Sequence, residues 1–340
     1  MTRVFGAASS ASTHYDRPMT TAGTRLVDLG GLELSITEQG EGPAVVLCHG
    51  FPGLGYSFRH QMAPLAAAGY RAIAPDMPGY GRSFRPSGPH EVTYAHITRV
   101  LVGLLDALGI DRAFFVGHDF GAPSAWNVAL RAPDRVAGLV ILSVPYDPDR
   151  SSRPPSEIYA AMAEKHFLHI HYFQEPGVAE AELDPNPEAF LTRLYWALSG
   201  QARYLDVWKH PSEGRGYLDV LPKAPPLPWS FMSRAEMDHY VSVFRKTGFG
   251  GGLDWYRAFD ANWEEAIDYE GAPLVVPTLF VAGSRDAVME MRGDAGIARM
   301  RETIPDLRGV HLLEGAGHWV QMEAAHELNG RLLEFLGSVR

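Results

Sequence analysis

Cysteine is almost absent from this sequence, and its scarcity excludes two kinds of structure. Cys48 is the single cysteine among 340 residues, so the chain can form neither an intrachain disulfide nor a metal site built from several thiolates. Because disulfides are rare in cytosolic proteins, the composition favours a cytoplasmic location. Cys48 itself is expected to be a small, buried, apolar residue.

An excess of positive charge is also lacking. The chain has 30 Lys and Arg against 40 Asp and Glu, which gives a formal net charge of −10 at pH 7. Proteins that bind nucleic acid use basic surfaces to contact the phosphate backbone. Nucleic acid is therefore not an expected partner.

Long apolar runs are missing as well. Residues 136–146 form the longest apolar stretch, which is far shorter than the roughly 20 residues that a helix needs to cross a bilayer. The first 24 residues lack the continuous apolar stretch of a signal peptide, and we expect residues 1–24 to form a flexible tail. No membrane anchor is expected.

The remaining composition is that of a folded, soluble protein, with 46% hydrophobic and 21% charged residues. From residue 25 onward, short apolar runs alternate with longer amphipathic ones, a pattern typical of a mostly parallel sheet flanked by helices. Two short segments around Gly30 and Gly31 predict an opening antiparallel hairpin. Buried strands are predicted at residues 44–48, 71–75, 113–117, 138–143, 278–283 and 310–313, and helices at 94–108, 122–131 and 324–336.

The strand and helix alternation stops after residue 146. Residues 147–264 contain aromatic-rich helical segments separated by clusters of Pro and Gly. We interpret this region as a helical cap (lid) inserted into an α/β core made of residues 25–146 and 265–340.

The most informative segment is residues 115–122, where a predicted strand runs through Gly117-His118-Asp119-Phe120-Gly121 into a predicted helix. A sharp turn of this kind, a nucleophile elbow, needs small residues two positions before and after its apex, because strand and helix approach closely there. The helix N-terminus would stabilise a carboxylate at the apex. The alternative is that Asp119 is only the N-cap of the helix.

Two further segments favour the catalytic interpretation. Asp286 follows a predicted strand, and His318 lies in a Gly-rich loop after the last predicted strand. The chain order nucleophile, acid, histidine is that of α/β-hydrolases. Because the loops that follow parallel strands open at one edge of the sheet, the three side chains can meet there. The alternatives are a helix cap for Asp286 and a histidine bonded to backbone for His318.

A loop with the sequence His49-Gly50-Phe51-Pro52 follows the strand that ends at Cys48. In an α/β-hydrolase this loop brings the backbone N–H of Phe51 beside that of Phe120, and the two form an oxyanion hole. His49 is expected to brace the loop rather than to carry a proton.

Aspartate at the apex determines the reaction type. A carboxylate is a poor nucleophile toward acyl groups but displaces leaving groups at alkyl carbons, forming a covalent ester. Water activated by His318, which Asp286 orients, would hydrolyse that ester. Esterase, lipase and peptidase activities are therefore excluded, and an epoxide or a carbon–halogen bond remains as the electrophile.

The leaving group distinguishes the two electrophiles. An alkoxide needs a proton donor, whereas a halide needs N–H donors, and the side chain of Phe120 offers none. The predicted cap offers the phenol of Tyr256. A dehalogenase of the same fold is the nearest alternative, and a catalytically silent ligand-binding protein is another.

These residues and several longer motifs resemble the α/β-hydrolase-fold epoxide hydrolases, similar to the soluble enzymes of plants, animals and actinobacteria. The resemblance covers nearly all of the chain from residue 25, and the cap motifs are more specific than the triad. The motifs are HGFP at 49–52, GHDFGA at 117–122, LSVPY at 142–146, YFQEPGVAEAEL at 172–183, TGFGGGLDWYRAFDANWE at 247–264 and GAGHWVQME at 315–323.

The resemblance implies Asp119 as nucleophile, His318 as base, Asp286 as its orienting acid and Tyr256 as a ring-opening donor. At one position the chain departs from the family, because His169 stands where a second tyrosine is usual. A neutral imidazole can donate one N–H to the epoxide oxygen, so His169 is expected to assist Tyr256.

Tyr172 is a further candidate for the second donor, because it lies three residues after His169 and shares its face if the segment is helical. The resemblance implies a small-molecule epoxide as partner and neither a metal nor an organic cofactor; a homodimer is left open. The side chains expected to line the substrate pocket are those of Phe51, Pro52, Phe120, Tyr172, Phe173 and Trp319.

Overall fold

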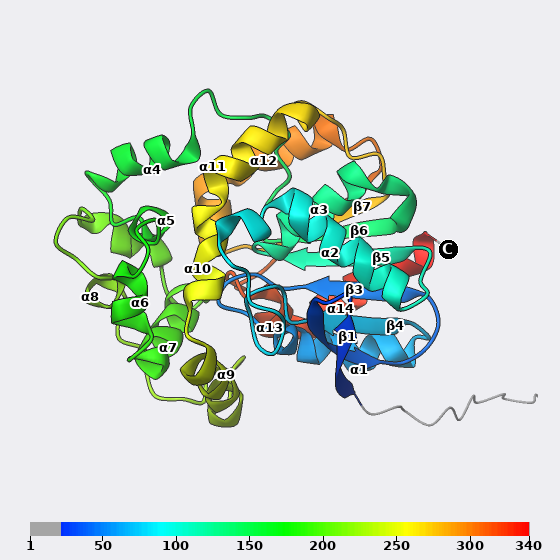
Figure 1. The fold of residues 1–340 in the computed structure, drawn as a ribbon, viewed down its shortest axis with the longest axis horizontal. Coiled ribbons are helices and arrows are strands. Elements are labelled where there is room, and N and C mark those ends of the chain that lie inside the picture. The colour runs from blue at the N-terminus through cyan, green and yellow to red at the C-terminus, as the bar shows by residue number, and fades with distance from the viewer. Residues whose placement is uncertain (1–21, 340) are drawn as a thin grey trace, which may run out of the picture.

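The computed structural model describes residues 22–339, which are built around an eight-stranded sheet of order β1-β2-β4-β3-β5-β6-β7-β8 (Figure 1). The first two strands form the predicted antiparallel hairpin, β2 is also antiparallel to β4, and all other neighbours are parallel. The strands are β1 (Gly23–Asp28), β2 (Glu33–Gln39), β3 (Ala44–Cys48), β4 (Arg71–Pro75), β5 (Ala113–His118), β6 (Val136–Leu142), β7 (Thr278–Gly283) and β8 (Leu307–Leu313).

The first strand begins earlier than expected, so the predicted boundary of the N-terminal tail at residue 24 is wrong. Gly23 and Thr24 pair with β2, where the hydroxyls of Thr24 and Thr37 lie 3.0 Å apart. This end of β1 is exposed and polar, and so lacks the apolar alternation by which a strand is predicted. Residues 1–21 of the predicted tail lie outside the described residues.

Helices cover both faces of the sheet, which is why β3, β5 and β7 are buried along their whole length. Alternate residues of each strand point to opposite faces: Val45 packs in the apolar cluster of α1 and α14, and Val46 in the cluster of α2, α3 and α12. The helices are α1 (Arg59–Ala67), α2 (Tyr94–Ala107), α3 (Gly121–Arg131), α12 (Ala287–Thr303) and α14 (Ala325–Ser338). The mostly parallel α/β architecture is confirmed.

Between β6 and β7 the chain is helical, as the aromatic-rich segments predict. These helices gather beyond one end of the strands (Figure 1). They are α4 (Pro155–Ala163), α5 (His169–Tyr172), α6 (Val178–Leu183), α7 (Pro187–Ala197), α8 (Tyr217–Val220), α9 (Arg234–Thr247), α10 (Gly250–Arg257) and α11 (Phe259–Glu265). The division into a core and a cap at residues 147 and 264 stays a prediction, and we use the word cap for this helical region.

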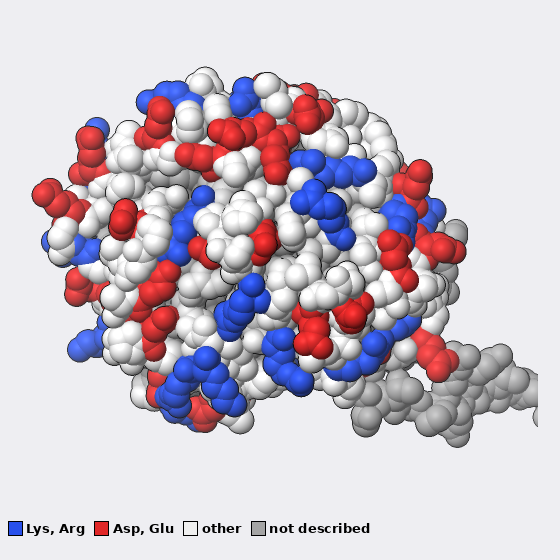
Figure 2. Space-filling view, viewed as in Figure 1, with Lys and Arg blue, Asp and Glu red and all other residues white. Residues whose placement is uncertain are grey.

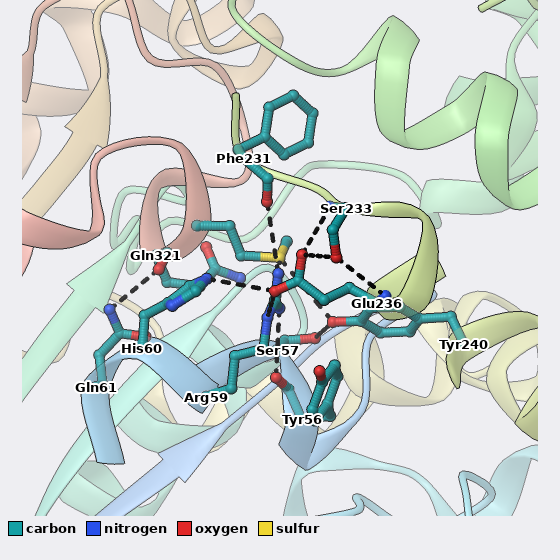
Figure 3. Close-up of polar contacts among 11 residues, drawn as sticks. Tyr56, Ser57, Arg59, His60, Gln61, Phe231, Ser233, Glu236, Tyr240 and Gln321 are labelled. Carbon is teal, nitrogen blue, oxygen red and sulfur yellow. Dashed lines mark hydrogen bonds and ion pairs between the residues drawn. The ribbon is translucent and has the colours of Figure 1, made fainter. Parts of the chain in front are cut away.

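A polar cluster joins α9 of the cap to α1 (Figure 3). The guanidinium of Arg59 donates to Glu236 with 2.6 Å between Nε and Oε1, and stacks over the ring of Tyr56. Glu236 also accepts hydrogen bonds from the backbone N–H and hydroxyl of Ser233, both at 2.7 Å. One carboxylate therefore both completes the capping box of α9 and ties that helix to α1.

The surface carries charges of both signs. On the face shown in Figure 2, Lys and Arg are interspersed with Asp and Glu, and no continuous basic surface is visible. Exposed ion pairs such as Arg299 with Asp149, at 2.6 Å, contribute to this mixing. Within residues 22–339, no helix combines the length and apolar character that crossing a membrane requires.

The ion pair between α1 and α9 predicts a pH-dependent stability. Burial raises the pKa of Glu236, but the Ser233 hydrogen bonds and Arg59 outweigh it and hold the pKa at about 2, below the ordinary 4.5. A carboxyl with a depressed pKa stabilises the fold fully above its unfolded pKa, and this contribution is lost as the pH falls toward 2. Glu236→Gln is expected to lower the free energy of unfolding by about 1.5–3 kcal/mol at pH 7, the usual effect of losing a charged hydrogen bond.

Urea unfolding at pH 7 and at pH 3 measures this effect. The difference in the free energy of unfolding between wild type and Glu236→Gln should be smaller at pH 3 than at pH 7. Glu334→Gln is the control, because Glu334 pairs with Arg331 on the surface of α14 at 3.6 Å with 75% of its side chain exposed. An equal difference in the free energy of unfolding at both pH values would contradict a depressed pKa for Glu236.

Candidate active site

Asp119 lies on the tight turn that the sequence predicts between β5 and α3. Its φ is +53°, a strained value for a residue other than glycine. A Cβ on Gly117 would overlap the carbonyl of Gly121, and a Cβ on Gly121 would overlap the carbonyl of Cys48. Both glycines are therefore required by the close approach of α3 to the strands.

The carboxylate of Asp119 faces backbone N–H groups rather than capping the helix. Its Oδ1 accepts from the N–H of Phe51 at 2.8 Å, and the N–H of Phe120 also bonds the carboxylate. The N-cap residue of α3 is Phe120, which makes no side-chain capping bond. The alternative interpretation of Asp119 as a helix cap is therefore not supported. Both N–H groups bond this carboxylate, and their role as an oxyanion hole stays a prediction.

His318 connects the two acids predicted with it. Its Nδ1 lies 3.2 Å from each oxygen of Asp286, and its Nε2 lies 3.5 Å from Oδ2 of Asp119. The side chain of Asp286 is fully buried and that of His318 is 5% exposed, whereas 21% of the Asp119 side chain is exposed. Asp286 also caps α12 by accepting from the N–H of Val288, so its predicted alternative role as a helix cap holds as well.

The charges of these three side chains shift the protonation of His318 and Asp119 more than burial does. Burial by itself lowers the pKa of His318, but Asp286 and Asp119 outweigh it and raise the pKa to about 10. Burial alone would raise the pKa of Asp119, but the hydrogen bond and charge of His318 hold it below its ordinary value. At neutral pH the unliganded site therefore contains an imidazolium between two carboxylates.

Neighbouring residues fix the loops that carry these groups. The ring of His49 bonds the carbonyl of Gly50 at 2.8 Å and accepts from the N–H of Met77 at 2.9 Å, which fits the bracing role expected for it. His118 and Ser143 both bond the backbone carbonyl of His318, at 2.7 and 3.1 Å. The sequence analysis did not identify these two residues as supports, although His118 stands next to Asp119.

The cap contributes Tyr256 from α10 and His169 from α5, whose rings stand perpendicular with centroids 5.7 Å apart. Burial and the negative charge of Asp119 raise the pKa of Tyr256 well above its ordinary value, so the phenol keeps its proton. Burial lowers the pKa of His169 to about 4, so the imidazole is neutral at pH 7. Both groups can therefore donate a hydrogen bond while uncharged.

Three of the expected pocket residues surround Tyr256. The rings of Phe51, Phe120 and Phe173 lie 5.4, 4.7 and 5.0 Å from its ring. Pro52 adjoins Phe51, and its carbonyl lies 3.5 Å from the hydroxyl of Tyr195. Aromatic rings thus surround the Tyr256 phenol.

The other two expected pocket residues are placed differently. The indole of Trp319 contacts His318 and stacks on Tyr195, and its N–H donates to the carbonyl of Tyr195 at 2.9 Å. The hydroxyl of Tyr172, the alternative candidate for the second donor, donates instead to Glu182 at 2.9 Å, which does not favour that alternative. That hydroxyl is held by a carboxylate that also binds two backbone N–H groups of the cap.

Two tyrosines that the sequence analysis missed stand behind His169. The hydroxyl of Tyr204 lies 2.8 Å from Nδ1 of His169, and the hydroxyl of Tyr217 lies 2.5 Å from that of Tyr204. No local motif marks them, because they are brought to α5 by the folding of the cap. Among residues 22–339, no cluster of three or more His, Cys, Asp and Glu side chains could hold a metal ion.

Comparison with known proteins agrees with this geometry. Residues 43–173 match the family described as alpha/beta hydrolase fold. Epoxide hydrolase A of Mycobacterium tuberculosis is 44% identical over 92% of this chain and 96% of its own. The crystal structure of epoxide hydrolase A from Mycobacterium thermoresistibile is similar with a TM-score of 0.86 at 42% identity, covering 93% of this chain and 98% of that one.

The structure of an epoxide hydrolase from an endophytic Streptomyces is also similar, with a TM-score of 0.88 at 37% identity over 94% of this chain and 96% of that one. These matches extend through the core strands and the helical cap alike, so they include the cap residues that the triad alone does not specify. The chain therefore belongs to the epoxide hydrolases of the α/β-hydrolase fold.

Proposed function

We propose that this protein opens an organic epoxide to a vicinal diol through a covalent alkyl ester on Asp119. The observation that carries the proposal is a carboxylate at the apex of a strained turn, bonded by the N–H groups of Phe51 and Phe120 and reached by His318. The relatives named as epoxide hydrolases support the choice of electrophile.

The first step forms the ester. Because Oδ1 of Asp119 is held by the N–H of Phe51, Oδ2 is the oxygen that attacks an epoxide carbon. The carbon–oxygen bond of the ring breaks, and the resulting alkoxide takes the proton of Tyr256. His169, being neutral, assists with a hydrogen bond rather than a proton transfer.

Formation of the ester also prepares His318 for the second step. Alkylation removes the negative charge of Asp119, one of the two charges that hold the pKa of His318 at about 10, so that pKa falls. His318 then gives up its proton, which returns Tyr256 to the phenol through solvent, and becomes a base.

The second step hydrolyses the ester. Neutral His318, oriented by Asp286, takes a proton from water, and the hydroxide attacks the carboxyl carbon of Asp119. The charge that develops on Oδ1 is stabilised by the N–H groups of Phe51 and Phe120. The diol leaves, Asp119 regains its charge, and His318 is again an imidazolium. The net reaction consumes one epoxide and one water.

The contacts of the site favour an epoxide over a haloalkane. A halide leaving group needs N–H donors, and the indoles of Trp319 and Trp255 lie next to His318 and Phe120. Both indole N–H groups donate to backbone carbonyls instead, that of Trp319 to Tyr195 and that of Trp255 to Pro78 at 3.0 Å. Of the two cap donors, neutral His169 offers a single N–H, whereas the phenol of Tyr256 can give up its proton, which suits an alkoxide.

Removing the nucleophile tests the assignment directly. Asp119→Ala is expected to lower the rate of diol formation from styrene oxide by more than about 10⁴-fold, because no ester can form. Asp134→Ala, at an exposed position, is the matched control and should keep wild-type activity. Substantial hydrolysis by Asp119→Ala would remove the nucleophile assignment.

Removing the base should trap the intermediate. His318→Gln is expected to accumulate the ester, because alkylation does not need the base. Intact-protein mass spectrometry after exposure to aryl, alkyl and cyclic epoxides should show a gain equal to the whole epoxide, located on the peptide of Asp119. With haloalkanes in the same panel, a gain equal to the haloalkane minus hydrogen halide would instead indicate a dehalogenase.

The two cap donors should differ in importance. Tyr256→Phe is expected to slow alkylation by about 10²–10⁴-fold, the usual contribution of a general acid. His169→Phe removes only a hydrogen bond from a neutral ring and should slow it far less. Single-turnover fluorescence with styrene oxide measures both rates. The opposite ranking would identify His169 as the principal acid.

A further inference from the structure

A short chain of hydrogen bonds runs from the interior of the cap to His169. The hydroxyl of Tyr217 on α8 lies 2.5 Å from that of Tyr204, which begins the 3₁₀ helix Tyr204–Lys209, and the Tyr204 hydroxyl lies 2.8 Å from Nδ1 of His169. The imidazole also stacks on the ring of Tyr217, with 6° between the planes and 5.8 Å between centroids. Both tyrosines are buried: Tyr204 is 5% exposed and Tyr217 is 1% exposed.

Counting hydrogens shows which group donates in each hydrogen bond of this series. Each hydroxyl has one hydrogen to donate, and neutral His169 has one N–H. If Tyr217 donates to Tyr204 and Tyr204 donates to Nδ1, both hydroxyl hydrogens are bonded. In the reverse direction the hydrogen of Tyr217 has no acceptor among the contacts of residues 22–339, which is unfavourable for a buried hydroxyl.

The direction of the chain determines which nitrogen of His169 carries hydrogen. With Nδ1 accepting from Tyr204, the hydrogen must lie on Nε2. The hydrogen bond from Tyr204 occupies Nδ1, and among residues 22–339 Nε2 has no hydrogen-bond partner. The imidazole ring is the neighbour of Tyr256 across the site and retains partial exposure. The Nε2–H is thus available to a substrate oxygen.

We propose that Tyr204, supported by Tyr217, is a positioning residue that holds His169 as the Nε2–H tautomer, so that His169 can donate a hydrogen bond to the epoxide oxygen. The inference rests on the proposed function for its substrate. Without the Tyr204 hydroxyl, His169 exchanges between two neutral tautomers, and the Nδ1–H form turns a lone pair toward the epoxide oxygen. The hydrogen-bond chain also polarises the imidazole as negative charge develops on that oxygen.

Nitrogen NMR of the full-length, unliganded protein labelled with [¹⁵N]histidine tests the tautomer without any substrate. The signals of His169 among the 14 histidines are identified by their loss in His169→Gln. In the wild type we expect a bare Nδ1 and a protonated Nε2, and in Tyr204→Phe a mixture of tautomers. A wild-type Nδ1–H, or a tautomer that Tyr204→Phe leaves unchanged, would overturn the proposal.

Tyr146→Phe is the matched control for this measurement. The hydroxyl of Tyr146 is also hydrogen-bonded, donating to the carbonyl of Ala272 at 2.6 Å, but Tyr146 does not contact His169, and removal of its hydroxyl should leave the His169 signals unchanged. Tyr217→Phe keeps the Tyr204 hydroxyl and should shift the tautomer balance less than Tyr204→Phe. The wild-type spectrum gives the tautomer itself, His169→Gln assigns the signals, and Tyr204→Phe tests whether the Tyr204 hydroxyl sets the tautomer.

Single-turnover alkylation by styrene oxide tests whether the tautomer of His169 affects the rate of ester formation. Tyr204→Phe is expected to slow ester formation by up to about tenfold, the effect of losing one neutral hydrogen bond, while the rate of ester hydrolysis stays the same. In a His169→Gln background the same substitution should have no effect on alkylation. Equal slowing in both backgrounds would show a merely structural role. Failure of the wild type to react with any epoxide would contradict the proposed function but leave the tautomer result standing.

Discussion

The close approach of α3 to β3 and β5 is the constraint on which the rest of the site depends. Because Gly117 and Gly121 let backbone atoms touch, the turn between them places Asp119 at φ +53° with its carboxylate beyond the strand end. The same turn brings the N–H of Phe120 to the carboxylate, and the loop after β3 supplies the N–H of Phe51. A larger residue at either glycine would separate these groups and dismantle the site.

Electrostatics then links the core residues to one another. Two carboxylates and one imidazole share a buried space, so the protonation of His318 follows the charge on Asp119. In the mechanism we propose, the ester on Asp119 removes that charge in every turnover, so the step that binds the substrate covalently also makes His318 a base. No conformational change is needed to order the two steps.

The cap supplies groups of a different kind. Tyr256 and His169 are both neutral because they are buried, and the aromatic rings of Phe51, Phe120 and Phe173 keep them so. Their usefulness as donors therefore depends on where their hydrogens lie rather than on charge. The position of the cap depends in part on α9, whose N-terminal Glu236 is held by Arg59 of α1.

The sequence by itself determined the approximate positions of the core strands, the elbow at Asp119 and the choice of Asp286 and His318 as its candidate partners. These are local patterns: apolar runs, paired glycines and polar residues directly after strands. The strand order came from the structure. Only the tertiary structure decided what the cap residues do. Tyr172 is three residues from His169 in sequence and Tyr204 is 35, yet the hydroxyl of Tyr172 bonds Glu182 and that of Tyr204 bonds His169. The reason is physical, since a hydroxyl has one hydrogen to donate and the folding of distant segments decides which acceptor receives it.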